Sequence, residues 1–256
     1  MPIAAGYYYF AYESEASNMP PVLLIHGAGG SHLSWPPEIR RMVGYHVFAI
    51  DLPGHGKSDA PGEQTILAYT EHVLAWMQAV NLYRAFVIGH SMGGAIALTI
   101  AATDPARVAG LGLIGVGIPF DVPPDILENL SNPAMVSTAI NQIKSLSFSP
   151  DANPRLVDLI SKRLVETRAS VLRGDFLACS RFNMAGPLEK LELPAILIAG
   201  AQDQMIPLRY AQLLAKKIKG AELSVIPEAG HLVMLEKPNE VAERLNGFFQ
   251  QREYFL

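Results

Sequence analysis

Short apolar runs alternate with longer helical windows along this chain, and that alternation constrains its fold more than any other feature. The runs are rich in Val, Ile and Leu, which is typical of strands buried on both faces. They span residues 22–26, 46–50, 85–89, 110–116, 195–200 and 222–226, and the helical windows between several of them span 65–80, 207–220 and 237–251. Right-handed crossovers place such helices on both faces of a mostly parallel sheet. The pattern therefore predicts an α/β fold, with the aromatic segment 7–12 as an added edge strand.

One region interrupts the alternation. Between about Ile118 and Ala185 no β-like run occurs, prolines recur, and apolar residues return at helical spacing. We predict a helical cap over residues 118–185, inserted into a core made of residues 1–117 and 186–256. Such an insertion can lie over the carboxyl ends of the strands, where open α/β sheets bind their ligands.

Composition excludes several classes of partner. The 256 residues are 50% hydrophobic and 17% charged, which indicates a packed globular protein, and a net charge of -4 without a long basic run argues against nucleic acid. The single cysteine, Cys179, excludes an internal disulfide and fits a reducing compartment. The chain begins without the pattern of a signal peptide, and no apolar stretch approaches 18 residues. We expect no membrane span and a cytoplasmic location, with a monomer and a dimer both open.

The stretch "VIGHSMGGAI" places Ser91 between a predicted strand and a predicted helix, in the pattern G-x-S-x-G. In that setting a sharp turn lifts the hydroxyl above the sheet, and the amino end of the helix favours negative charge there. The alternative is a tight turn with an incidental serine. We predict that Ser91 is a nucleophile.

A serine nucleophile needs a base, and the base needs an orienting carboxylate. Of the seven histidines, His231 lies in a glycine-bounded loop after the last predicted strand, whereas His90 adjoins the serine and cannot easily face it. Asp203 follows the strand at 195–200, so the chain order is serine, aspartate, histidine, as in α/β enzymes of this kind. The alternative acids are Asp121 and, less favoured, Asp125 and Glu236.

Five motifs in this order resemble those of α/β-hydrolases along the whole chain. They are "HGAGG" (26–30), "DLPGHGKSD" (51–59), "GHSMGG" (89–94), "AGAQDQMIP" (199–207) and "EAGHLVMLEKP" (228–238). The resemblance implies an eight-stranded, mostly parallel sheet with a helical cap. It also implies an oxyanion hole made by the backbone N–H groups of Ala28 and Met92. No cofactor and no metal are expected; "GHGKS" looks like the end of a phosphate-binding loop but lacks its first glycine.

Within the family, a serine at the nucleophile position disfavours haloalkane dehalogenases and epoxide hydrolases, which use a carboxylate there. The first hypothesis is a carboxylesterase that cleaves small or medium acyl esters through an acyl-enzyme on Ser91. Carbon–carbon bond hydrolases commonly have Asn before the serine and Trp after the histidine, where this chain has His90 and Leu232. That reading stays open, as do a thioesterase, a cofactorless lyase and a signal-ligand receptor with slow turnover.

Apolar side chains of the cap could line an acyl pocket, or could simply seal the cap onto the core. The cap candidates are Phe120, Ile126, Leu127, Met135, Phe148, Phe176, Leu177, Phe182 and Met184. As pocket residues we select Phe120, Leu127, Phe148, Phe176 and Phe182, together with Leu232.

Overall fold

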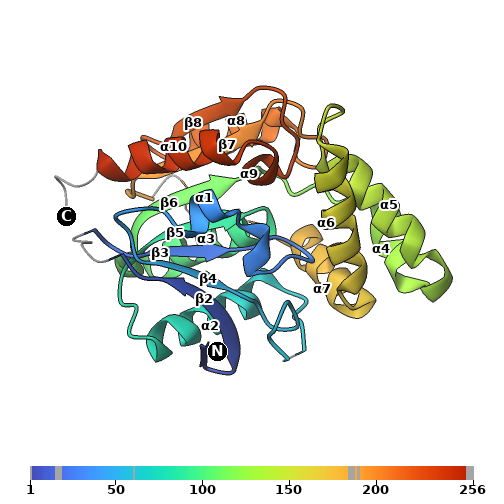
Figure 1. Cartoon of the computed structure of the whole chain (residues 1–256), viewed down its shortest axis with the longest axis horizontal. Helices are drawn as coiled ribbons and strands as arrows, with labels where there is room; N and C mark the ends of the chain where they lie inside the picture. The colour runs from blue at the N-terminus through green and yellow to red at the C-terminus, as the bar shows by residue number, and fades with distance from the viewer. Residues whose placement is uncertain (1, 15–18, 60, 184–187, 189–190, 252–256) are drawn as a thin grey trace.

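A twisted eight-stranded sheet forms the centre of the computed structural model, which describes residues 2–14, 19–59, 61–183, 188 and 191–251 (Figure 1). The strand order is β1-β2-β4-β3-β5-β6-β7-β8. The strands are β1 (Ile3–Ala4), β2 (Tyr7–Tyr12), β3 (Val22–Ile25), β4 (Val47–Ile50), β5 (Ala85–His90), β6 (Val108–Ile114), β7 (Ala195–Gly200) and β8 (Glu222–Ile226). From β4 to β8 all neighbours are parallel, and β1 and β2 add an antiparallel edge. The predicted fold class is confirmed. The segment 7–12 is a strand, as expected, but the two-residue β1 pairs with its outer side, so β2 is the second strand from the edge.

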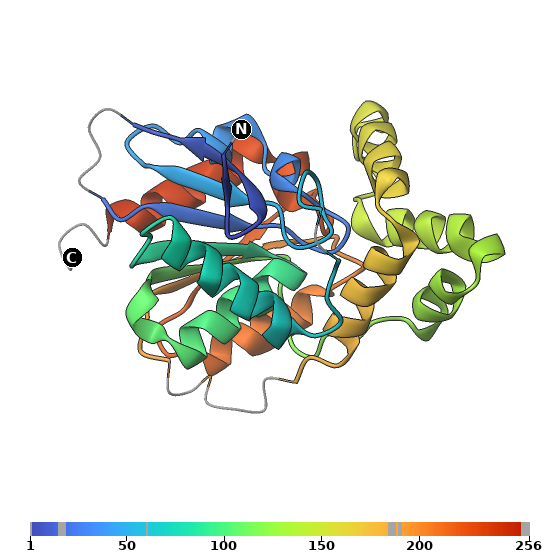
Figure 2. The same ribbon diagram turned by 90° about the horizontal axis from the view of Figure 1, so that it is seen from below.

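Helices cover both faces of this sheet (Figure 2). Those of the core are α1 (Pro37–Arg40), α2 (Ile66–Ala79), α3 (Met92–Thr103), α8 (Leu208–Lys217), α9 (Val233–Glu236) and α10 (Pro238–Gln250), with short 3-10 turns η1 (His32–Ser34) and η2 (Pro105–Arg107). Successive strand side chains point to opposite faces, so β3 buries Leu23 against the α2 and α3 side and Leu24 against the α1 and α10 side. Both faces need apolar residues, which explains the continuous apolar runs.

The cap, as we call helices α4 to α7, lies beyond the carboxyl ends of the parallel strands (Figure 1). It consists of α4 (Pro124–Ser131), the turn η3 (Pro133–Met135), α5 (Val136–Ser147), α6 (Pro154–Glu166) and α7 (Ala169–Ser180). Ile126, Ile140 and Phe176 belong to its own apolar cluster. The apolar residues that recur at helical spacing in the sequence include Val136, Ile140 and Ile143, which lie on α5, and Leu156, Leu159 and Ile160, which lie on α6. The predicted cap boundary after residue 185 and the pocket candidate Met184 lie outside the described residues.

Candidate active site

Ser91 occupies the single-residue turn between β5 and α3, where its backbone has φ 51° and ψ -118°. A side-chain-bearing residue at positive φ is strained, so the surrounding structure must hold it there. Its N–H donates to the carbonyl of Ile114 on β6 (2.9 Å), and its own carbonyl accepts from the N–H of Gly94 (2.8 Å). The Ser91 side chain does not cap α3. The turn is therefore held by backbone hydrogen bonds, and the hydroxyl is left to the cavity.

The glycines of the motif are explained by close backbone approach. A Cβ at Gly89 would overlap the carbonyl group of Gly93, and a Cβ at Gly93 would overlap the carbonyl oxygen of Ile25 on β3. Helix α3 can start directly at the strand ends only if both positions lack a side chain. The sharpness of the Ser91 turn thus follows from these two glycines.

His231 and Asp203 meet at the ends of two neighbouring strands. The Nδ1 of His231 lies 2.9 Å from Oδ2 of Asp203, and both residues are buried. The other carboxylate oxygen accepts the N–H of Ile206 at 2.8 Å, which fixes the carboxyl group. Since a carboxylate accepts, the Nδ1 of His231 carries the proton and Nε2 is the basic nitrogen. No described residue is hydrogen-bonded to that Nε2.

The alternative acids have other positions. Asp121 lines the cavity but is exposed, and Asp125 starts α4 in the cap. Glu236 accepts the N–H of Gly230 (2.9 Å) and the hydroxyl of Ser149 (2.5 Å). Glu236 thus joins the loop before His231 to the chain that leaves α5 in the cap. Of the four candidate acids, Asp203 is the one that the structure places on the His231 ring.

His90 supports the His231 loop from beneath. Its Nε2–H donates to the carbonyl oxygen of His231 at 3.1 Å, and the two ring centroids are 4.8 Å apart. Burial, followed by the nearby His231, holds the pKa of His90 well below its usual value, so the ring is neutral. The position of His90 at the end of β5, directly before Ser91, was the only sequence signal for this role.

The loop after β3 brings Ala28 to the cavity wall, next to Ser91. The Nδ1–H of His26 donates to the carbonyl of Gly27 (2.8 Å), and the N–H of Gly30 donates to the same carbonyl (3.0 Å). Met92 is fully buried at the first position of α3, where a helix has no internal acceptor for its N–H groups. Met92 thus directly follows the nucleophile and Ala28 lines the same cavity, and the role of their N–H groups in catalysis stays a prediction.

Sequence reasoning missed a buried acidic group under this loop. Asp175, on the cap helix α7, is fully buried and accepts hydrogen bonds from the N–H of Gly29 (2.8 Å), Nε2 of His55 (2.8 Å) and the hydroxyl of Tyr69 (2.6 Å). An aspartate within the apolar face of α7, which includes Phe176, was the signal that could have revealed it.

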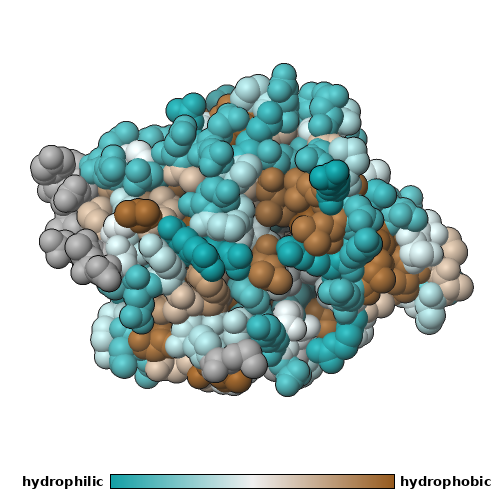
Figure 3. Space-filling view, in the orientation of Figure 1, coloured by the Kyte–Doolittle hydropathy of each residue, from teal (hydrophilic) through white to brown (hydrophobic). Residues whose placement is uncertain are grey.

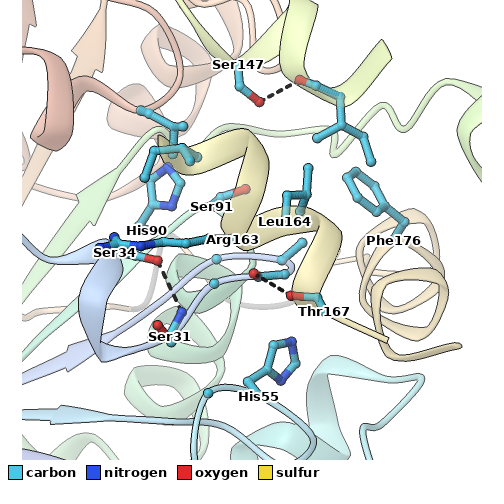
Figure 4. Close-up of a pocket in the computed structure, with 18 of the residues that line it drawn as sticks. Ser31, Ser34, His55, His90, Ser91, Ser147, Arg163, Leu164, Thr167 and Phe176 are labelled. Carbon is cyan, nitrogen blue, oxygen red and sulfur yellow. Dashed lines mark hydrogen bonds between the residues drawn. The ribbon is translucent and has the colours of Figure 1, made fainter. Parts of the chain in front are cut away.

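A cavity of about 620 Å³ lies between the sheet ends and the cap, and both Ser91 and His231 line it. Figure 4 shows Ser91 with Leu164 and Phe176 around the same hollow. On the face seen in Figure 3, hydrophobic side chains gather between the core and the cap, edged by hydrophilic ones. The space is of the size that small-molecule ligands occupy.

Three of the six selected pocket residues line this cavity, namely Phe120, Phe176 and Leu232. The described lining does not include the other three. Leu127 packs within the cap's own cluster, Phe148 is buried behind Gly230, and Phe182 lies edge-to-face behind Phe120 with centroids 5.6 Å apart. The lining also contains side chains that were not selected, such as Ile143, Ile160, Leu164 and Met205.

Two further observations concern binding partners. Within residues 2–14, 19–59, 61–183, 188 and 191–251, no group of three or more His, Cys, Asp or Glu side chains is arranged to hold a metal ion. None of the helices described here has both the length and the apolar character needed to cross a bilayer.

Comparison with known proteins gives consistent matches over most of the chain. A family model described as alpha/beta hydrolase fold matches residues 20–238. The dihydrolipoyllysine-residue acetyltransferase component of the acetoin cleaving system of Pseudomonas putida is 31% identical over 250 residues, which are 94% of this chain and 66% of that protein. This chain therefore spans about two thirds of the length of that relative.

Two other matches cover similar shares. Monoacylglycerol lipase ABHD6 of Mus musculus is 24% identical over 263 residues, 93% of this chain and 78% of the lipase. A solved structure described as a thermophilic esterase superposes with a TM-score of 0.82 at 27% identity, covering 96% of this chain and 99% of the esterase.

Proposed function

The chain belongs to the α/β-hydrolase fold family, and from that premise we propose that it hydrolyses carboxylic esters of small or medium acyl chains through an acyl-enzyme on Ser91. The observation that carries the proposal is the arrangement around one cavity. A strained serine, a histidine whose Nδ1 is held by Asp203, and the glycine-rich loop at Ala28 all meet there. The similarity to a lipase and to an esterase supports the same class of substrate.

Acylation begins when Nε2 of His231 takes the proton of the Ser91 hydroxyl as Oγ attacks the ester carbonyl. Asp203 holds the ring in the tautomer that leaves Nε2 basic, and it stabilises the imidazolium that forms. The negative charge on the former carbonyl oxygen is met by the N–H groups of Ala28 and Met92. The tetrahedral intermediate collapses, the C–O bond to the alcohol breaks, and His231 returns its proton to the leaving alcohol.

Deacylation repeats these steps with water. His231 removes a proton from a water molecule that attacks the acyl carbon, the same N–H groups stabilise the second oxyanion, and the proton returns to Ser91 Oγ as the acid leaves. The enzyme is restored, and one ester and one water become one acid and one alcohol.

The cavity walls favour an uncharged acyl chain. Phe120, Phe176 and Leu232 supply apolar surface of the cavity that Ser91 lines, and Leu164 of α6 adds to it (Figure 4). A volume of about 620 Å³ accommodates a small or medium ester.

A second candidate is acyl transfer involving a thioester. It is favoured by the similarity to the acetyltransferase component from Pseudomonas putida. The acyl-enzyme would be the same, and a thiol would replace either the alcohol as leaving group or water as acceptor. Comparing an oxygen ester with the thioester of the same acyl chain, with and without a dithiol acceptor, separates the two candidates.

The first experiment is a burst assay with p-nitrophenyl esters of graded chain length on the wild type and Ser91→Ala, with intact mass read at early times. We expect steady turnover and an acyl adduct on Ser91 in the wild type. We expect a loss of about 10⁴-fold or more in kcat/KM in the variant. The conservative control is Thr99→Ser on the same helix, which removes only a methyl group far from the hydroxyl of Ser91.

Other outcomes point elsewhere. Turnover that stops after one equivalent, with a persistent adduct, would favour a signal receptor. Absence of both turnover and adduct with every ester would overturn the esterase proposal and leave carbon–carbon hydrolysis or lyase chemistry.

A further inference from the structure

The loop that carries Ala28 is held by side chains of the cap rather than by the core alone. The N–H of Gly29 donates to Oδ2 of Asp175 on α7 (2.8 Å), and the carbonyl of Gly29 accepts from the hydroxyl of Thr167, between α6 and α7 (3.1 Å). The peptide groups on both sides of Gly29 are thus fixed from the cap. Figure 4 shows the Thr167 contact beside the cavity.

The packing around Gly29 leaves no space for a side chain. The residue has φ 64°, and a Cβ there would lie 2.7 Å from Leu164 and 2.8 Å from Leu172, both side chains of the cap. Positive φ and this close approach together require glycine. The cap helices therefore press directly on the loop at the residue that follows Ala28.

Asp175 makes a stable anchor because its charge is balanced inside the protein. Burial alone would lower the pKa of His55, but the Asp175 carboxylate raises it. The Nδ1–H of His55 donates to the carbonyl of Pro53 (2.9 Å) and Nε2–H donates to Asp175 (2.8 Å), so both ring nitrogens carry protons. Burial, with the nearby Asp175, raises the pKa of Tyr69, which therefore remains a donor. Asp175 therefore accepts hydrogen bonds from Gly29, His55 and Tyr69, and the His55 ring, which carries a proton on each nitrogen, balances the charge of its carboxylate.

We infer that Asp175 is a positioning residue for the oxyanion hole: it fixes Gly29 so that the adjoining Ala28 N–H is aimed at the developing oxyanion. The inference rests on the proposed function, because it assigns a cap residue to the same acyl-transfer site. It makes the cap a structural part of the catalytic machinery as well as a cover over the substrate. Removal of an oxyanion-hole donor slows acyl transfer by about 10²–10³-fold, so displacement of one is expected to cost less than this.

The test measures kcat, KM and the affinity for a trifluoromethyl ketone that forms a tetrahedral adduct with serine. Asp175→Ala is expected to lower kcat by about 10- to 100-fold and to leave KM within about threefold of the wild type. Its affinity for the ketone is expected to fall in proportion to kcat/KM. The affinity for the alcohol product, which is uncharged and places no negative oxygen in the oxyanion hole, should stay within about threefold. A merely structural role would not separate these two ligands.

The matched control is Tyr69→Phe. It removes the third hydrogen bond of the same buried carboxylate and leaves the bonds to Gly29 and His55 in place. We expect Tyr69→Phe to lower stability while kcat and the ketone affinity stay within about twofold.

Where Asp175→Ala fails to fold, Thr167→Val carries the test, because it removes only the partner of the Gly29 carbonyl. Thr167→Val is expected to lower the affinity for the ketone by about threefold or more. Folded variants that retain both kcat and ketone affinity, while Ser91→Ala abolishes turnover, would overturn the inference and leave the proposed function standing. A wild type without turnover on any ester would overturn the proposed function and the inference together.

Discussion

Of the three buried histidine–aspartate pairs that the described residues place at the cavity, His231–Asp203 and His55–Asp175 have almost the same geometry. His231 lies 2.9 Å from Asp203, and His55 lies 2.8 Å from Asp175. All four side chains are buried, and both histidines line the cavity.

The pairs differ in the second ring nitrogen. No described residue binds Nε2 of His231, whereas both nitrogens of His55 are held, one by Asp175 and one by the carbonyl of Pro53. An imidazole can act as a base only through a free nitrogen, so His55, with both nitrogens hydrogen-bonded, is not placed to act as a base, whereas His231 can exchange a proton. A buried His–Asp pair therefore does not by itself identify a catalytic base.

Replacing each of these histidines by glutamine should produce the largest difference between the two pairs. His231→Gln is expected to lower kcat/KM by about 10⁴-fold or more, because it removes the nitrogen that takes the serine proton. His55→Gln is expected to lower kcat by about 100-fold at most and to reduce the free energy of unfolding by about 3 to 5 kcal/mol, because it leaves the Asp175 charge buried without its partner. Ester kinetics and urea unfolding of both variants make the measurement.

Each variant controls for the other, since both replace a buried histidine that lines the cavity. Equal losses of activity in the two would refute the assignment of separate roles.

Lowering the pH should change the stability of the protein, because its buried histidines differ in the direction of their pKa shifts. Burial, with the neighbouring His55, lowers the pKa of His26 to about 4, and burial with the neighbouring His231 lowers that of His90. Because the unfolded histidines titrate near pH 6.5, the unfolded state binds more protons between about pH 6.5 and pH 4, and stability falls as the pH is lowered through that window. The raised pKa of His55 has the opposite sign: its contribution is complete below about pH 6.5 and is lost as the pH rises through its folded value.

Urea unfolding at a series of pH values from 4.5 to 7.5 tests this. Between about pH 6.5 and pH 4, the slope of the free energy of unfolding against pH should correspond to an uptake of about two protons on unfolding. In His26→Gln the slope should correspond to about one proton fewer. A slope that is the same in the variant and the wild type would contradict the assignment of His26.

The smallest effect is expected at Met92, whose proposed role belongs to its backbone. Met92→Leu keeps the N–H and nearly the same buried volume, so kcat/KM should stay within about twofold and stability should fall by less than about 1.5 kcal/mol. Ester kinetics decide the matter, and a loss of tenfold or more would mean that the side chain itself takes part in the reaction.

Much of the fold followed from local patterns. The apolar runs became β3 to β8, and the predicted fold family and the class of ester-acting hydrolases are confirmed at the level of the family. The turn at Ser91 was predictable for a similar reason, because the backbone comes too close to Gly89 and Gly93 for either to carry a side chain. Gly89 lies against the carbonyl group of Gly93, and Gly93 lies against the neighbouring strand β3. Side-chain periodicity and glycine requirements are short-range properties, and a sequence displays them directly.

Other features depended on tertiary structure. Asp203 and Asp121 both follow strands, and only the packing of the strand ends places one of them on the His231 ring. Helical spacing marks a face of the cap as apolar but does not say what covers it, so Phe176 lines the cavity while Leu127 packs inside the cap. Asp175 meets Gly29 across 146 residues of chain, and no local pattern encodes such a contact. The sequence by itself determined the sheet and the nucleophile turn. Long-range packing decided which polar groups share the site, because their partners come from the ends of separate strands and from the cap and meet only when these elements pack together.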